Sequence, residues 1–324
     1  MGKHSRRQFI GGAAAGLVVG CGGDSAKPTP GQASGGGGSG GTAKRTFGVV
    51  FQTMNNPFFV ELEAGLKAVI EKRGDSLVTL DSQFDAVKQR NDLSDLLLRG
   101  VAGLFVNPVD WEGVRSSLQQ AKRKNVPVVI VDAPVRDADL VLCQVASDNV
   151  EAGRLACRRL AAKQPKAQVV LLDLPANKAC LDRVAGFTEE MAKHPEMKVL
   201  ATQVGKGTTE GALPVMRDML GRFPNLTAAF PINDPSALGC VAAIEAAGRG
   251  GKVDVVTVDG SAEGVKAIQA GKILSSSAQF PREIGAKAAE ALYDSLAGKA
   301  PEKEIKVRVE LVDAANADKF APKS

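Results

Sequence analysis

The sequence predicts an α/β fold made of two doubly wound lobes, each built on a mainly parallel sheet. From residue 45 onward, short runs rich in β-branched residues alternate with amphipathic helical segments. The strand-like runs are apolar over most of their length, which is typical of parallel strands covered by helices on both faces. About ten such repeats follow one another. They are too many for one small open sheet, so two lobes are expected.

The expected strands cover residues 46–52, 76–82, 101–107, 126–132, 140–147, 167–174, 198–204, 226–233, 253–260 and 273–280. The segments between them, such as residues 58–74 and 85–100, carry apolar residues at i, i+3, i+4 and i+7. Gly74, Gly100 and Gly248 stand where glycine commonly ends a helix. The alternation of strands and helices restarts near residues 145–153. We therefore expect the seam between the lobes there.

Residues 1–20 are expected to be a twin-arginine export signal. The basic stretch "SRRQFI" precedes an apolar run that is shorter than the roughly 20 residues of a spanning helix. The stretch "VVGC" that follows is similar to a bacterial lipobox, which predicts lipidation of Cys21. Residues 21–44, rich in Gly, Ser and Pro, are expected to form a disordered tether. A basic cytoplasmic tail is the alternative interpretation of the first residues.

Charge and histidine content exclude several classes of function. Loss of residues 1–20 removes three basic residues and no acidic one, so the net charge falls from +5 to about +2. Such a nearly neutral body gives no argument for nucleic-acid binding. The chain has two histidines, His4 in the predicted leader and His194 in a polar loop. A histidine-based triad or metal site is therefore not expected, and no cofactor is predicted.

Motifs for nucleotides and metals are also missing from the sequence. "GKGTTEG" at 205–211 and "GRGGKV" at 248–253 lack the spacing of a phosphate-binding loop. The first predicted strand is followed by "FQTMNNPFF" instead of a glycine-rich loop. The cysteines of the body form no C-x-x-C pattern and are expected to be buried thiols. A disulfide between two of them is the alternative if the protein lies outside the cytoplasm. They are Cys143, Cys157, Cys180 and Cys240.

In doubly wound folds, ligands bind beyond the carboxyl ends of the strands. Short polar side chains occupy most of these positions here: Gln52, Asn56, Asp81, Asn107, Asp132, Asn233, Asp259 and Gln279. Their fixed donors and acceptors suit a small neutral ligand rich in hydroxyls. Asp132 and Asp259 also fit a catalytic carboxylate pair, and that alternative stays open.

Three further residues have two interpretations each. Phe58 and Phe59 open a helix, where a pair of phenylalanines usually packs in the core. Adjacent rings point in different directions on a helix, so we expect at least one to face the cleft and contact the C–H face of a sugar. Arg183 begins a helix after residues 167–174 and is either exposed or a charged donor in the cleft.

Seven ordered motifs in residues 46–313 resemble the periplasmic sugar-binding proteins of bacterial ABC transporters. They are "TMNNPFF", "LDSQ", "NPVD", "ASDNVEAG", "PINDPSALG", "VDG" and "AQFPREIGAKAAE". The resemblance is nearest to the ribose-binding type and implies the type I periplasmic binding protein fold, with Rossmann-like lobes joined by three crossovers. These are expected near 146–148, 278–281 and 308–311. The N-terminal lobe would cover 45–147 and about 280–308, and the C-terminal lobe 148–279 and about 309–316.

The resemblance also carries the family's binding positions onto this chain. The polar positions fall on Asn56, Asp132, Arg183, Asn233, Asp259 and Gln279, and the aromatic pair falls on Phe58 and Phe59. Other positions depart from the ribose-binding type. Gln52 replaces a small hydroxyl residue and would itself face the ligand, Ala133 replaces an arginine, and Gly207 and Val258 replace phenylalanines. We therefore expect a monosaccharide or polyol that differs from ribose in size or shape.

The resemblance implies a binding protein that does no chemistry. We expect a monomeric lipoprotein, exported to the periplasm, that delivers its ligand to the permease subunits of an ABC importer. A ligand-binding sensor for a membrane receptor or kinase is one alternative, and an exported sugar-active enzyme is another. Repressors of the lactose type share the fold but begin with a helix-turn-helix. The predicted export signal argues against that function.

Overall fold

The computed structural model describes residues 44–321. The predicted export signal, Cys21 and the predicted tether as far as residue 43 lie outside this range. The described chain contains two six-stranded sheets whose neighbouring strands are parallel except for one antiparallel pair. No helix within residues 44–321 has the length and apolar character needed to cross a membrane.

The first sheet has the strand order β11-β5-β4-β3-β1-β2. Its strands are β1 (Thr46–Phe51), β2 (Ser76–Asp81), β3 (Leu104–Val106), β4 (Val128–Val131), β5 (Cys143–Ser147) and β11 (Glu304–Val307). Helices α1 (Pro57–Lys72) and α9 (Pro281–Leu296) pack on one face through a core rich in phenylalanine and leucine. Helices α2 (Ala86–Leu98) and α3 (Arg115–Arg123) contribute to a second apolar cluster. A short helix, η1 (Ala138–Leu140), precedes β5.

The second sheet has the strand order β12-β10-β9-β8-β6-β7. Its strands are β6 (Gln168–Asp173), β7 (Lys198–Val204), β8 (Ala228–Pro231), β9 (Asp254–Asp259), β10 (Ser275–Ala278) and β12 (Glu310–Asp313). One apolar cluster joins the sheet to α4 (Asn149–Lys163) and α5 (Lys178–Met191). Another joins it to α6 (Thr209–Arg222), α7 (Asp234–Ala246), α8 (Ala262–Gln269) and η2 (Ala317–Lys319). The predicted doubly wound α/β fold is therefore confirmed.

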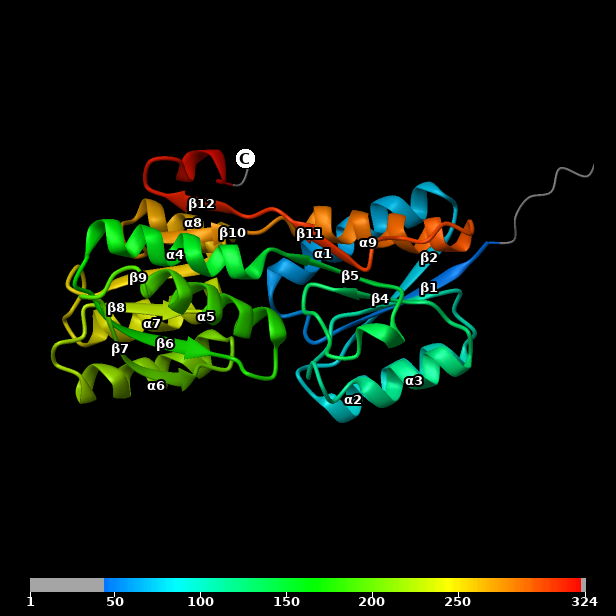
Figure 1. The fold of residues 1–324 in the computed structure, drawn as a ribbon, viewed down its shortest axis with the longest axis horizontal. Helices are drawn as coiled ribbons and strands as arrows, with labels where there is room; N and C mark the ends of the chain where they lie inside the picture. Colours follow the sequence, from blue (N-terminus) through cyan, green and yellow to red (C-terminus); the bar gives the residue numbers. More distant parts are fainter. Residues whose placement is uncertain (1–43, 322–324) are drawn as a thin grey trace, which may run out of the picture. The chain divides into compact units, whose positions relative to one another are not determined.

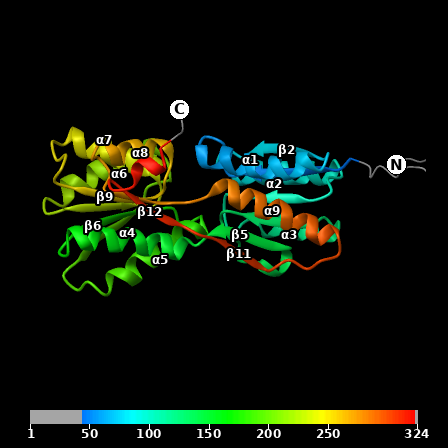
Figure 2. The same ribbon diagram turned by 90° about the horizontal axis from the view of Figure 1, so that it is seen from above.

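The chain passes between the two sheets three times. The first passage lies between the end of β5 at Ser147 and the start of α4, and the second lies between β10 and α9. The third joins β11 directly to β12 through residues 308 and 309. Figures 1 and 2 show these stretches in green, orange and red between the two lobes. Each passage falls in or beside a segment where a crossover was expected.

All ten expected strands are present, but β11 and β12 were not among them. Each of these strands has four residues, lies at the edge of its sheet and begins with an exposed glutamate. Because an edge strand buries little surface, it lacks the apolar run that marks a central strand. The predicted glycine C-caps are borne out, with φ values of +80°, +72° and +65° at Gly74, Gly100 and Gly248.

One glycine in each of two helix pairs allows the helices to come into close contact. A Cβ atom on Gly65 would overlap the carbonyl oxygen of Arg282, so only a glycine lets α1 and α9 approach in this way. A Cβ atom on Gly153 of α4 would likewise overlap the carbonyl oxygen of Arg183 of α5. This second contact fixes the start of α5, which carries a predicted ligand-binding side chain.

The four cysteines of the described chain are buried and free. The alternative of a disulfide is therefore not realised among residues 44–321. Burial raises the pKa of the Cys143 thiol to about 11 and that of Cys157 to about 12. These side chains act as small apolar groups in the core.

Candidate ligand-binding cleft

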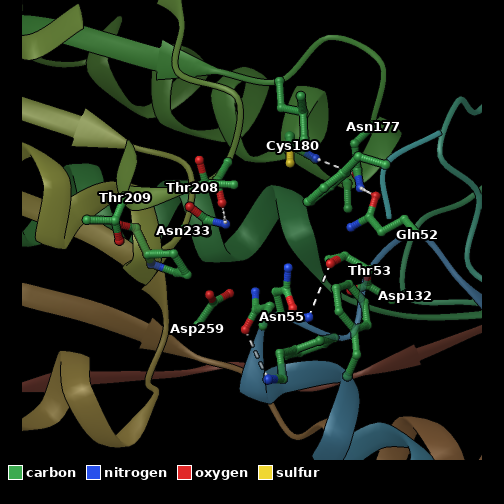
Figure 3. Close-up of a pocket in the computed structure, with 18 of the residues that line it drawn as sticks. Gln52, Thr53, Asn55, Asp132, Asn177, Cys180, Thr208, Thr209, Asn233 and Asp259 are labelled. Atoms are coloured by element: carbon green, nitrogen blue, oxygen red, sulfur yellow. Dashed lines mark hydrogen bonds between the residues drawn. The ribbon is translucent and has the colours of Figure 1, made fainter. Parts of the chain in front are cut away.

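A cavity of about 570 Å³ lies beyond the carboxyl ends of strands from both sheets. The structure brings all nine predicted ligand-binding residues to its lining: Gln52, Asn56, Phe58, Phe59, Asp132, Arg183, Asn233, Asp259 and Gln279. Figure 3 shows Asn233 and Asp259 on one side of the cavity, with Gln52 and Asp132 on the other. That these side chains bind a ligand stays a prediction.

The aromatic side of the cavity is set by the first turn of α1. Asn56 caps this helix, and its Oδ1 accepts a hydrogen bond from the backbone N–H of Phe58 at 3.0 Å. The Phe58 ring meets Phe59 edge to face with centroids 5.3 Å apart, and Phe59 packs on Phe51 at 5.6 Å. Both rings are therefore buried in the core of the first lobe and also line the cavity. Core packing and a position at the cavity are therefore both observed for this pair, and contact with a sugar stays a prediction.

Asp132 follows β4 and is 4% exposed. Its Oδ2 accepts a hydrogen bond from Nδ2 of Asn107 at 3.1 Å, whereas its Oδ1 has no hydrogen-bond partner among the described residues. Its φ is +65°, a left-handed conformation that carries strain in a residue with a Cβ atom. Burial raises the pKa of Asp132 to about 7; the charge of Asp259 adds to this rise, and Arg183 opposes it.

Asp259 follows β9 and faces the guanidinium of Arg183, with 3.6 Å between its Oδ1 and Nη1. Burial raises the pKa of Asp259, and Arg183 opposes the rise. The guanidinium is fixed by two further hydrogen bonds of 2.8 Å, from Nε to Oδ1 of Asn149 and from Nη1 to the carbonyl oxygen of Ile232. The interpretation of Arg183 as an exposed surface residue is therefore wrong, because the side chain is 4% exposed and lines the cavity.

Asp234 joins the segments around Asp259 through buried hydrogen bonds. Its backbone N–H donates to Oδ2 of Asp259 at 3.3 Å, and its carboxylate accepts hydrogen bonds from Ser261 and from Oγ of Ser276. Burial raises the pKa of Asp234 to about 7, and the charge of Asp259 adds to the rise. The sequence placed Asp234 after a strand but gave no sign of this bracing function.

Sequence reasoning missed the lining residues that follow β6 and β7. They include Leu174, Asn177, Cys180, Thr208, Thr209 and Glu210. Nδ2 of Asn177 donates to Oε1 of Gln52 at 3.3 Å, and the backbone N–H of Trp111 donates to the carbonyl oxygen of Ala176 at 3.1 Å. Both hydrogen bonds join the first lobe to the second. The rule that ligands bind at strand ends could have found these loops as well.

The departures from the ribose-binding type have clear positions. Val258 is fully buried in the second lobe and is not part of the cavity lining, whereas Gly207 lines the cavity with a φ of +72°. Ala133 is also fully buried. The second lobe therefore lines the cavity with Leu174 and with the loop after β7. In the described part of the chain, no group of three or more His, Cys, Asp or Glu side chains is placed to hold a metal ion.

A family model described as a periplasmic binding protein domain matches residues 47–300. The ribose import binding protein of Escherichia coli strain K12 is 36% identical over 272 residues, covering 83% of this chain and 91% of that protein. The binding protein of the arabinose ABC transporter from Shewanella sp. ANA-3, solved with α- and β-L-arabinofuranose, has a TM-score of 0.80 and 29% identity, covering 85% of this chain and 94% of that chain. A Mycobacterium smegmatis structure in complex with β-D-fucofuranose has a TM-score of 0.79 and 26% identity, with coverages of 85% and 93%.

Proposed function

The chain belongs to the periplasmic binding protein domain family, and from this premise we propose that it is the solute-binding protein of an ABC importer for a monosaccharide or polyol. One observation carries the proposal. The cavity between the strand ends is lined by buried amides, carboxylates and one guanidinium beside a pair of phenylalanine rings. Such a lining offers directional hydrogen bonds to hydroxyls and an apolar surface to the C–H face of a sugar ring.

Binding would select ligands by the completeness of their hydrogen bonds. Oδ1 of Asp132 and Oε1 of Gln279 are buried acceptors without a partner in the described chain. A ligand group that donates to each atom removes an unsatisfied acceptor, and a ligand that lacks the group leaves a cost of about 1–3 kcal/mol. Ligand contacts to both lobes would favour the closed arrangement, which the permease then recognises.

The relatives support a ligand of monosaccharide size. Their names and structures include ribose, L-arabinofuranose and β-D-fucofuranose. Gly207 lines the cavity, whereas Ala133 is fully buried outside the lining. We therefore propose a ribose-like monosaccharide or a related sugar or polyol as the ligand.

We propose binding without catalysis. Oδ1 of Asp259 accepts a hydrogen bond from Gln279 and faces Arg183, so this carboxylate is held in a fixed network. Asp132, the other member of the alternative catalytic pair, is bound to Asn107. Incubation of the purified protein with each sugar that binds, followed by chromatography, tests this. Appearance of a product would favour the exported enzyme instead.

The predicted leader and lobes complete the proposal. We propose that a twin-arginine signal exports the protein, that Cys21 carries a lipid anchor, and that the tether holds a monomeric body at the membrane. The N-terminal lobe would comprise residues 45–147 and about 280–308, and the C-terminal lobe 148–279 and about 309–316. A sensor for a membrane receptor or kinase would use the same ligand site, and copurification with permease subunits separates the two functions.

A thermal-shift screen of the folded body over pentoses, hexoses, polyols and nucleosides tests the ligand class. We expect a concentration-dependent rise in Tm with at least one sugar or polyol, because a ligand that binds only the folded state stabilises it. Calorimetry then gives the Kd of each hit. If every sugar and polyol leaves Tm unchanged while another class raises it, the proposed function is wrong.

A further inference from the structure

We propose that the ligand of this cleft carries a positively charged amine among its hydroxyls, and that the amine binds at Oδ1 of Asp132. This inference rests on the proposed function, because it specifies the ligand class of the same cleft. It joins two observations, one on hydrogen-bond partners and one on charge.

The buried atoms that lack a partner at this cavity are both acceptors. They are Oδ1 of Asp132, which is 4% exposed, and Oε1 of Gln279, which is 6% exposed. Both residues line the cavity, so a ligand that donates a hydrogen bond to each side chain would supply the partner that its acceptor lacks. An ammonium group has three donors and no acceptor, whereas a hydroxyl donates one hydrogen and also needs a donor in return.

The charge of the cavity lining is unbalanced. Among the described residues of the lining, Asp132, Asp259 and Glu210 carry carboxylates and Arg183 carries the single positive charge. Arg183 lies 3.6 Å from Asp259 and is held there by Asn149 and the carbonyl oxygen of Ile232. It therefore pairs directly with Asp259, and its charge reaches Asp132 without an ion pair or hydrogen bond to that residue.

No other cationic side chain of the described chain lines the cavity beside Asp132. The next residue, Ala133, is fully buried and carries no charge. The hydrogen bond to Asp132 comes from the neutral amide of Asn107. The environment of Asp132 therefore favours a cation from outside the protein.

A buried carboxylate without a cation is unfavourable. The free-energy cost of burying its charge can be reduced in two ways. It takes up a proton, which agrees with the raised pKa of Asp132, or it pairs with a ligand cation. A charge-assisted hydrogen bond is about twice as strong as a neutral one. Glu210, exposed at the rim of the same cavity, would also attract a cation during association.

Calorimetry with matched ligand pairs tests the proposal. Each pair keeps one skeleton and exchanges a hydroxyl for an amine: D-ribose and 3-amino-3-deoxy-D-ribose, D-glucose and D-glucosamine, D-galactose and D-galactosamine. At pH 7 we expect at least one amino sugar to bind about ten-fold more tightly than its neutral partner, which is the size of one charge-assisted contact.

The Asp132→Asn variant links this preference to one atom. It keeps the size of the side chain and removes the charge, so the amino and neutral members of the pair should bind within about three-fold of each other. Asp95→Asn is the matched control, because Asp95 pairs with Arg99 on α2 and does not line the cavity. This control should keep the full preference. Circular dichroism and Tm establish that both variants fold.

The outcomes separate the two proposals. If neutral sugars bind and every amino counterpart binds equally or more weakly, the amine inference is wrong and the proposed function stands. A preference for amino sugars that survives in Asp132→Asn also contradicts the inference. If no neutral sugar, amino sugar or polyol binds the native protein, both proposals are wrong.

Discussion

Gln279 donates a hydrogen bond from Nε2 to Oδ1 of Asp259 at 2.7 Å. Gln279 lies in the crossover between β10 and α9, whereas Asp259 ends β9 and lines the cavity. The backbone N–H of Gln279 also donates to the carbonyl oxygen of Asp259 at 2.9 Å. One crossover segment is therefore bound directly to a carboxylate of the proposed ligand site, which gives ligand contacts a short route to the connection between the lobes.

Replacement of Asp259 by Asn should weaken ligand binding strongly. The change removes the charge that faces Arg183 and leaves the guanidinium buried without its counter-ion. A ligand hydroxyl that donates to this carboxylate also loses a charge-assisted hydrogen bond of about 1.5–3 kcal/mol, or roughly ten-fold or more in Kd. Calorimetry with the best hit of the screen measures it. The control Asp254→Asn, at the other end of β9 and paired with Lys163, should keep the native Kd. A native Kd in Asp259→Asn would remove this residue from the site.

Stability of the ligand-free protein should fall as the pH rises from about 4 to 7. Burial raises the pKa of Asp132 from 3.8 to about 7. The folded state therefore holds the proton more tightly than the unfolded state, and this stabilisation is complete below about pH 4 and is lost as the pH rises through 7. Asp132→Asn should reduce the fall in Tm, measured by scanning calorimetry at several pH values. The prediction fails if the variant and the native protein show the same pH dependence.

Replacement of Gly153 by Ala should destabilise the fold and weaken ligand binding. The added Cβ overlaps the carbonyl oxygen of Arg183, so α4 and α5 must separate. Overpacking of this kind costs about 1–3 kcal/mol, and each kcal/mol lowers Tm by roughly 2–4 °C in a chain of this size. Gly221→Ala is the matched control, since its Cβ has no neighbour within 4 Å on α6. It should be neutral or slightly stabilising, because alanine favours a helix more than glycine. Equal Tm values for the two variants would contradict the packing argument.

The fluorescence of Trp111 should report ligand binding. It is the single tryptophan of the chain, and its backbone N–H bonds to Ala176 of the opposite lobe while its ring lies beside Arg136. A ligand that shifts the lobes alters these surroundings, so the emission should change with a midpoint equal to the Kd from calorimetry. Trp111→Phe should lose the signal yet keep the rise in Tm with ligand. Saturating ligand without any change in emission would show that the Trp111 loop does not follow binding.

The sequence by itself determined the fold and the principal residues of the cavity. Continuous apolar strands alternating with helices predict parallel sheets, because helices must cover both faces. The carboxyl ends of parallel strands meet at one edge, so polar residues directly after each strand come together without further information. Asn56, Asp132, Asn233, Asp259 and Gln279 all reach the cavity for this reason.

Only the tertiary structure decided how charge and hydrogen bonds are shared among these residues. Arg183 pairs directly with Asp259 because Asn149 and Ile232 fix its guanidinium, and none of these contacts is local in sequence. The bracing by Asp234 depends on serines from two other segments. A sequence pattern shows at which end of a strand a side chain lies. The distances between strand ends decide which buried carboxylate has a partner and which is left for the ligand.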